Sequence, residues 1–185
     1  IKDDVLCRVS DTETSQGIIA VLKKRTLPMP EAPSRIFIPS EIGDPGNMGT
    51  MLRTALAAGV ELALIPPATV DVFSPKVMRS AMGAHFYLPI HIKSWEEIAQ
   101  ILKDYPCYLA EAKGEVPYDQ VDYRQRFALI VGSEASGAGE EAQNLATQRI
   151  SIPIAETCES LNAAVAAGII LFEAVRQRKI LEKDS

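Results

Sequence analysis

Short, uninterrupted apolar runs recur along this chain, and segments with helical spacing separate them. A strand that is apolar at every position is buried on both faces, which is typical of a parallel sheet covered by helices. The pattern therefore predicts an α/β fold with a mainly parallel sheet and helices on both faces. The predicted strands are 17–22, 35–39, 61–66, 87–90, 107–110, 127–131 and 149–154.

The helical segments between these runs begin and end at recognisable residues. Ser94 followed by Glu97 three residues later forms a capping-box pattern at the start of an amphipathic segment. The closing segment, 161–179, is almost entirely small residues over 163–168, which lets another backbone approach closely. We expect it to pack against the sheet or a second subunit. The predicted helices are 48–59, 74–81, 94–105, 140–147 and 161–179.

Length and composition favour one folded domain. The chain has 185 residues, 47% of them hydrophobic and 23% charged, which is typical of a globular protein. Its longest apolar stretch, 163–172, is far shorter than the roughly 18 residues of a membrane span. No basic-then-apolar leader precedes it, so we expect no membrane partner and a cytoplasmic location.

Charge and cysteine content restrict the partners further. A net charge of −5, from 19 basic and 24 acidic residues, argues by itself against a nucleic-acid partner, because phosphate contacts come from Lys and Arg. The cysteines stand far apart without a Cys-x-x-Cys pair, and only two histidines accompany them, so we expect no metal site. These residues are Cys7, Cys107, Cys158, His85 and His91.

Three segments fall where strands are predicted to end, the usual ligand-binding edge of an open α/β sheet. The first, 44–59, is a turn leading into a helix that presents Asn47, Arg53 and Thr54. An arginine in this otherwise apolar helix could serve a site. It could equally well extend its guanidinium into solvent.

The second segment, 127–142, places Gly132, Glu134 and Gly137 directly after an apolar strand. Glycines at such a point let a ligand approach the backbone, although a tight turn from strand to helix is the simpler alternative. The segment is not a dinucleotide fingerprint, because Glu134 stands in place of the second glycine, and no phosphate-loop motif occurs. A Rossmann-type nucleotide enzyme is therefore disfavoured.

The third segment, 150–168, ends a strand at Pro153, crosses a polar loop and enters the closing helix. Ser160 could act as the N-cap of that helix. Asn162 would then lie inside the helix, where asparagine is a poor former and needs hydrogen-bond partners when buried. Asn162 is therefore a candidate site residue.

Taken in this order and spacing, the three segments resemble the SpoU (TrmH-like) family of 2′-O-ribose RNA methyltransferases, within the SPOUT superfamily. The resemblance extends from Gln16 to about Lys179, and residues 1–15 are interpreted as a linker or the cut end of an N-terminal region. Two departures stand out: Ala135 replaces a frequent glycine, and Ala163 with Ala164 replaces a frequent Val-Ser. The matching residues are Asn47, Gly49, Arg53 and Thr54; Gly132, Glu134 and Gly137; and Ile152, Pro153, Ser160, Leu161 and Asn162.

The resemblance implies that residues 16–185 form a methyltransferase domain with a deep C-terminal trefoil knot, and that the chain is a homodimer. It implies S-adenosyl-L-methionine as cofactor and structured RNA as substrate, with ribosomal RNA favoured and transfer RNA possible. The implied cofactor-binding residues are Val131, Gly132, Gly137, Ile152, Ile154 and Leu161. The implied catalytic residues are Arg53, which would bind a phosphate or the developing alkoxide because a guanidinium keeps its proton, and Asn47, Glu134, Ser160 and Asn162, which would position it and the ribose.

Two expectations remain beside this reading. A catalytically silent RNA-binding or scaffold member of the same family would share the fold without the activity. The acidic excess lies outside residues 16–100, which carry eight basic and seven acidic residues. We therefore expect this domain alone to bind RNA weakly, with an N-terminal domain supplying much of the affinity.

Overall fold

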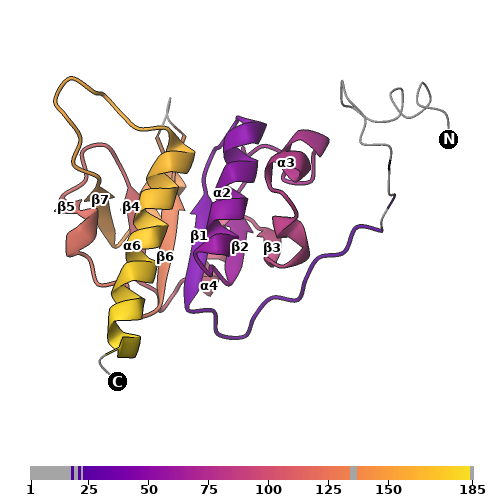
Figure 1. The fold of residues 1–185 in the computed structure, drawn as a ribbon, viewed down its shortest axis with the longest axis horizontal. Helices are drawn as coiled ribbons and strands as arrows, with labels where there is room; N and C mark the ends of the chain where they lie inside the picture. Colours follow the sequence, from indigo (N-terminus) through magenta and orange to yellow (C-terminus); the bar gives the residue numbers. More distant parts are fainter. Residues whose placement is uncertain (1–17, 19–20, 22, 134–136, 184–185) are drawn as a thin grey trace.

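The chain folds around a seven-stranded sheet in which every strand pair is parallel. The computed structural model describes residues 18, 21, 23–133 and 137–183. Strands run in the order β3-β2-β1-β6-β4-β7-β5, so β1 and β6 form the centre (Figure 1). The strands are β1 (Arg35–Pro39), β2 (Leu62–Ile65), β3 (Ile90–Ile92), β4 (Cys107–Ala110), β5 (Val116–Pro117), β6 (Phe127–Val131) and β7 (Gln148–Ser151).

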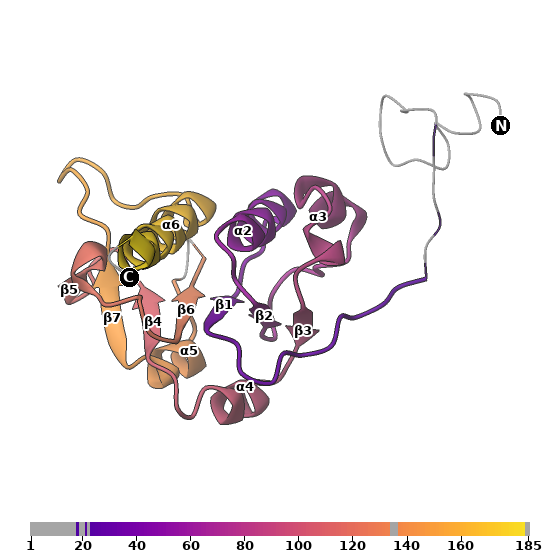
Figure 2. The same ribbon diagram turned by 60° about the horizontal axis from the view of Figure 1, so that its bottom comes forward.

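Helices cover both faces of this sheet, as the apolar runs predicted. Figure 2 shows α2, α3 and α6 on one side and α4 and α5 on the other. The helices are α2 (Pro45–Ala57), α3 (Pro75–Ser80), α4 (Trp95–Ile101), α5 (Glu140–Leu145) and α6 (Ala163–Lys183), with short 3-10 turns η1 (Ala84–Phe86) and η2 (Tyr118–Gln120).

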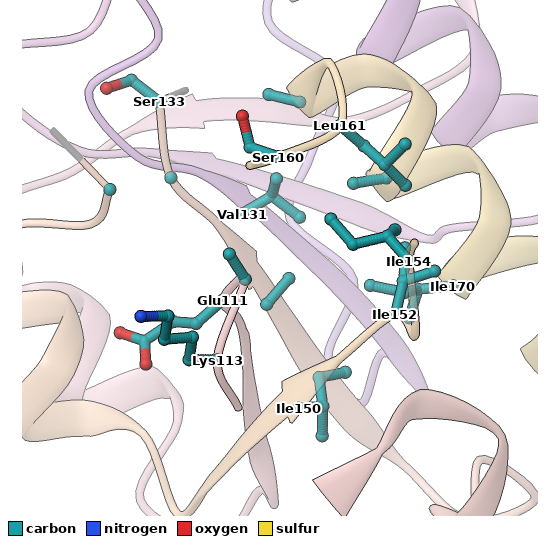
Figure 3. Close-up of a pocket in the computed structure, with 16 residues that line it drawn as sticks. Glu111, Lys113, Val131, Ser133, Ile150, Ile152, Ile154, Ser160, Leu161 and Ile170 are labelled. Carbon is teal, nitrogen blue, oxygen red and sulfur yellow. The ribbon is translucent and has the colours of Figure 1, made fainter. Parts of the chain in front are cut away.

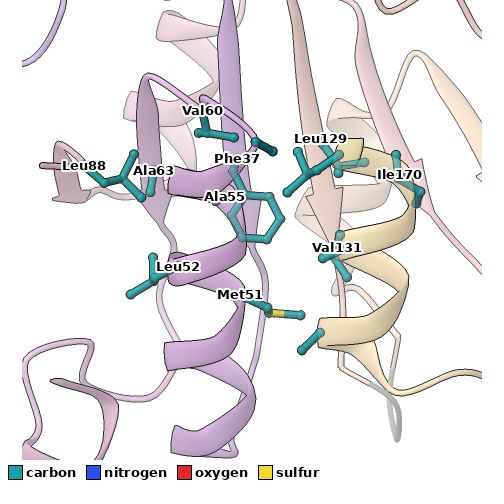
Figure 4. Close-up of a cluster of buried hydrophobic side chains, with 14 of the residues drawn as sticks. Phe37, Met51, Leu52, Ala55, Val60, Ala63, Leu88, Leu129, Val131 and Ile170 are labelled. Atoms are coloured by element: carbon teal, nitrogen blue, oxygen red, sulfur yellow. The ribbon is translucent and has the colours of Figure 1, made fainter. Parts of the chain in front are cut away.

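Alternate residues of the central strands supply two separate cores. Phe37 and Leu129 point into the cluster beneath α2 and α6 (Figure 4), whereas Ile36 and Ile130 point into the cluster beneath α4 and α5. Side chains of a strand alternate between the two faces of a sheet. Because both faces are covered, every residue of β6 is buried.

Small residues bring α6 against α2 and the sheet. Ala163, Ala167 and Ala174 are buried along one side of α6, and a Cβ added at Gly168 would meet Thr54 of α2 at 3.5 Å. Of the two expected neighbours, the sheet is confirmed, because Ala167 and Ile170 pack with Leu129 and Val131 of β6. Its opposite side is exposed at Val165, which has 51% of its surface accessible.

Three sequence predictions differ from the structure. In the predicted strand 17–22, Ile18 and Val21 lie outside any strand and are 83% and 95% exposed, and the other four residues lie outside the described part of the chain. The strand predicted at 87–90 is β3, at Ile90–Ile92, because η1 occupies the preceding residues. The short strand β5 was missed, since two residues carry no periodicity. The capping box of α4 is confirmed.

Tyr123 is the largest fully buried side chain and packs edge-on against Tyr108 and Phe127. Its hydroxyl has no hydrogen-bond partner among the described residues, and a buried polar group without a partner destabilises the folded state. We expect Tyr123→Phe to leave the free energy of unfolding unchanged or to raise it by up to about 1 kcal/mol. Urea denaturation measures this. A loss of 2 kcal/mol or more would show that the hydroxyl does find a partner.

Candidate active site

A pocket of about 380 Å³ opens where β4, β6 and β7 end and α6 begins. Its walls are largely aliphatic, with Ile150, Ile152, Ile154, Leu161 and Ile170 pointing toward its centre (Figure 3). This is the edge at which parallel α/β sheets bind ligands. All six residues predicted to bind a cofactor line the pocket, together with Ser160: Val131, Gly132, Gly137, Ile152, Ile154 and Leu161.

Gly132, Ser133 and Gly137, which follow β6, line one side of the pocket. Ser133 and Gly137 pair with each other, with N–H to carbonyl distances of 2.9 and 3.0 Å. A Cβ added at Gly132 would lie 2.4 Å from the backbone of Gly137 and Ala138, so this close approach requires a glycine. Gly137 itself has φ of +71°, a conformation that glycine adopts without strain.

The segment after β4 supplies the charged side chains of the pocket. Glu111 and Lys113 line it, and the Glu111 carboxylate lies 3.7 Å from the Arg149 guanidinium. Neither residue was identified from the sequence. The end of the apolar run 107–110 could have indicated Glu111 and Lys113 as pocket residues, because parallel strands end at one edge of a sheet.

Asn47 and Asn162, 115 residues apart in the chain, meet beside the pocket. Asn162 Nδ2 donates to Asn47 Oδ1 at 3.1 Å. Asn162 Oδ1 accepts from the backbone N–H groups of Ala164 and Val165, and its carbonyl accepts from Ala166. Asn162 is therefore the N-cap of α6. The expectations that Ser160 would hold that position, and that Asn162 would lie inside the helix, were wrong, because α6 begins at Ala163.

The start of α2 is fixed in the same way. Asp44 accepts from the backbone N–H of Asn47 at 2.7 Å, and Pro45 occupies the first turn. Caps of this kind satisfy N–H groups that have no partner within the helix. Two capped helix starts thus hold the two asparagine amides at one point.

Arg53 lies apart from the pocket. It is exposed on α2, and within the described part of the chain no hydrogen bond or ion pair holds its guanidinium. In the single chain, Arg53 therefore extends into solvent, which was one of the alternatives expected from the sequence. Glu134, the remaining predicted site residue, lies outside the described residues.

The described cysteines and histidines form no metal centre. Among the residues that the structure describes, no three His, Cys, Asp or Glu side chains are placed to share an ion. Cys107 is buried, and burial raises the pKa of its thiol to about 11. Cys158 is exposed in the loop before α6, and Cys7 lies outside the described residues.

In the same described ranges, no helix is both long and apolar enough to cross a membrane.

Comparison with known proteins decides the family. The model of the SpoU rRNA Methylase family matches residues 34–172, which includes the pocket and both asparagines. The chain belongs to the SpoU rRNA methylase family. The parallel sheet expected from that resemblance is confirmed, and the trefoil knot stays a prediction.

Individual SpoU proteins agree with this assignment. The chain is 32% identical to the 23S rRNA (guanosine(2553)-2′-O)-methyltransferase RlmP of Bacillus subtilis, over 93% of this chain and 70% of that protein. It is 30% identical to the mitochondrial rRNA methyltransferase 3 of Mus musculus, over 95% of this chain but 56% of that protein. The chain thus spans between half and three quarters of these two relatives.

A solved SpoU structure extends the likeness to the fold. The methyltransferase AviRb of Streptomyces viridochromogenes, in complex with the cofactor AdoMet, superposes with a TM-score of 0.76 at 30% identity. The match covers 82% of this chain and 64% of AviRb. This SpoU chain therefore shares its fold with a relative that binds S-adenosyl-L-methionine.

Proposed function

We propose that this chain transfers a methyl group from S-adenosyl-L-methionine to a ribose 2′-hydroxyl of ribosomal RNA. The observation that carries the proposal is the aliphatic pocket at the ends of β4, β6 and β7, with Asn47 and Asn162 joined beside it. Relatives that methylate 2′-hydroxyls of 23S rRNA supply the substrate class. Cytoplasmic location and a methyltransferase domain at 16–185 belong to the same proposal.

The pocket residues fit the adenosyl part of the cofactor. An adenine ring needs apolar walls and a few fixed polar groups, and the isoleucines with Leu161 provide such walls. Gly132, held against the backbone of Gly137 and Ala138, lets the ligand contact main-chain groups directly. When bound there, the cofactor supplies an electrophilic methyl group on a sulfonium.

The remaining task of the protein is to align the 2′-oxygen and to stabilise the charge that develops as its proton leaves. Arg53 is suited to that second part, because a guanidinium stays protonated and binds a phosphate or an alkoxide through two parallel N–H groups. We assign proton removal to phosphate or water. Asn47, Glu134, Ser160 and Asn162 position Arg53 and the ribose.

The exposed position of Arg53 supports a dimeric site. Arg53 does not line the pocket of its own chain. It can take part in the reaction if it reaches the pocket of a second copy of the chain. The outer side of α6 offers an apolar contact surface, with Val165 and Phe172 51% and 49% exposed. A face of this kind is typical of subunit contacts. Homodimerisation through α6 is therefore part of the proposal.

The proposed function is tested with purified protein, tritiated S-adenosyl-L-methionine and ribosomal RNA. A ribose 2′-O-methyl group blocks alkaline cleavage at that nucleotide, so the label should appear in alkali-resistant dinucleotides. Titration calorimetry with the cofactor runs in parallel. Cofactor binding with label in alkali-sensitive products would show that a nucleobase, and not a ribose, is methylated. Absence of cofactor binding would support the catalytically silent scaffold.

Phe172→Glu should separate the subunits and abolish methyl transfer. The substitution puts a charge at the centre of the exposed α6 surface, where it would be desolvated on association. Sedimentation velocity should show a monomer, while calorimetry still shows cofactor binding, because Phe172 does not line the pocket. Lys103→Glu, an exposed charge change beside α4, serves as control. A fully active monomer would overturn the dimeric site.

A further inference from the structure

One long stretch of this acidic chain contains no acidic residue and is therefore net basic. Residues 72–95 form its longest segment without Asp or Glu, and they include Lys76, Arg79 and Lys93. The chain as a whole carries a net charge of −5. A local basic excess on an acidic protein is the electrostatic footprint of a polyanionic partner.

Exposed apolar side chains lie in the same stretch. Met82, Phe86 and Tyr87 are 71%, 57% and 75% exposed, whereas Ala84 and Leu88 between and beside them are buried. Met82 adopts φ of +48°, a conformation that is uncommon for residues other than glycine. The turn from α3 into η1 thus keeps two aromatic rings at the surface, while Ala84 and Leu88 anchor it to the core.

The histidine in this turn does not add to the charge. His85 Nε2 donates to the Val72 carbonyl at 2.7 Å, and the ring packs against Phe73. Burial lowers the pKa of His85, so the imidazole is neutral at pH 7. Lys93 pairs with the Glu97 carboxylate at 2.6 Å. The positive charge beside the turn therefore comes from the exposed Lys76 and Arg79 of α3.

This turn is tied rigidly to the start of α2. Ser80 Oγ donates to the Gly46 carbonyl at 2.9 Å, and a Cβ added at Gly49 would lie 2.4 Å from Ser80 Cβ. Figures 1 and 2 show α3 beside α2, on the side of the sheet away from β5. The surface is thus fixed relative to Asn47 and Arg53, which lie on α2.

We propose that Lys76, Arg79, Met82, Phe86 and Tyr87, here called the α3–η1 surface, bind unpaired nucleotides of the RNA. The rings of Phe86 and Tyr87 are exposed and can stack on bases, and the exposed Lys76 ammonium can bind a phosphate. Single-stranded nucleic acid is bound by this combination of aromatic rings and positive charge. A protein partner would need less charge beside the rings. The inference rests on the proposed function, because it takes RNA as the substrate.

The test compares binding of two fluorescein-labelled RNAs to the full chain, a hairpin with an unpaired loop and a fully paired duplex of equal length. Phe86→Ala/Tyr87→Ala removes the rings, and Phe86→Tyr/Tyr87→Phe keeps them. We expect the alanine pair to weaken hairpin binding about tenfold or more, since stacking contributes strongly for each base. The ring-keeping pair should bind the hairpin like the original chain, and duplex binding should change little.

A second variant probes the charge. Lys76→Glu should make the negative slope of log affinity against log salt shallower by about 0.7, the value for one phosphate contact on a single strand. Lys103→Glu, near α4 on the other face of the sheet, should leave that slope unchanged. Cofactor titration with each variant shows whether the pocket is intact.

The outcomes separate this inference from the proposed function. Hairpin binding that depends on the rings, in a chain without methyl transfer, would support the surface and reject the function. Methyl transfer with hairpin affinity unchanged in the alanine pair would reject the surface. A third result is that the alanine pair sediments as a smaller species and loses RNA affinity only because its subunits have separated. That result would make the surface a contact between protein subunits and would also overturn the inference.

Discussion

Arg53→Lys should lower methyl transfer by a factor of about 100 to 1,000, the usual effect of removing one positioned donor to a developing oxyanion. Lysine keeps the charge but loses the planar pair of N–H groups. Single-turnover rates with saturating RNA and cofactor measure the effect.

Because Arg53 is exposed, this substitution should change methyl transfer without changing the stability of the fold. Lysine and arginine have nearly equal helix propensity, and the guanidinium has no bond to lose within the described part of the chain. The melting temperature and the cofactor affinity should therefore match those of the original chain. Near-normal turnover in Arg53→Lys would remove Arg53 from the reaction and leave it a surface residue.

Gly132→Ala should abolish cofactor binding and lower stability. The new methyl group would lie 2.4 Å from main-chain atoms of Gly137 and Ala138, so the backbone that lines this side of the pocket must move away. Forcing a methyl group into a filled space costs about 1–3 kcal/mol. Each kcal/mol lowers the melting temperature by roughly 2–4 °C in a chain of this length. Titration calorimetry and thermal denaturation measure the two effects.

Gly43→Ala is the matched control for this substitution. No atom lies within 4 Å of a Cβ added at Gly43, which precedes α2 in an exposed turn. Its cofactor affinity and melting temperature should stay unchanged. If Gly132→Ala binds the cofactor as tightly as Gly43→Ala does, the residues after β6 do not line the binding site.

The sheet could be predicted from the sequence because its signal is local. Phe127–Val131 and Leu62–Ile65 are apolar at every position and are followed by a glycine and a proline, so their burial and boundaries follow from the residues alone. The edges carried less information. β5 has two residues, and the run at 17–22 has the composition of a strand but exposes Ile18 and Val21, because pairing depends on neighbours that composition does not specify.

The candidate site divides in the same way. The six cofactor candidates came from the family resemblance, whose second and third motifs lie at or after the ends of the strands β6 and β7. Glu111 follows the end of a strand too, but a single carboxylate after a strand has no motif around it. The bond between Asn47 and Asn162 could not be predicted from spacing, because it joins the starts of two helices from distant parts of the chain.

The strand order also decides when the pocket can exist during synthesis. β1 pairs with β2 on one side, and both are made early, but its other neighbour, β6, is made much later. A nascent chain therefore carries β1 with an unpaired edge until β6 emerges, and such edges invite aggregation. The pocket closes only when α6 follows. Cofactor binding would thus report that synthesis has passed α6.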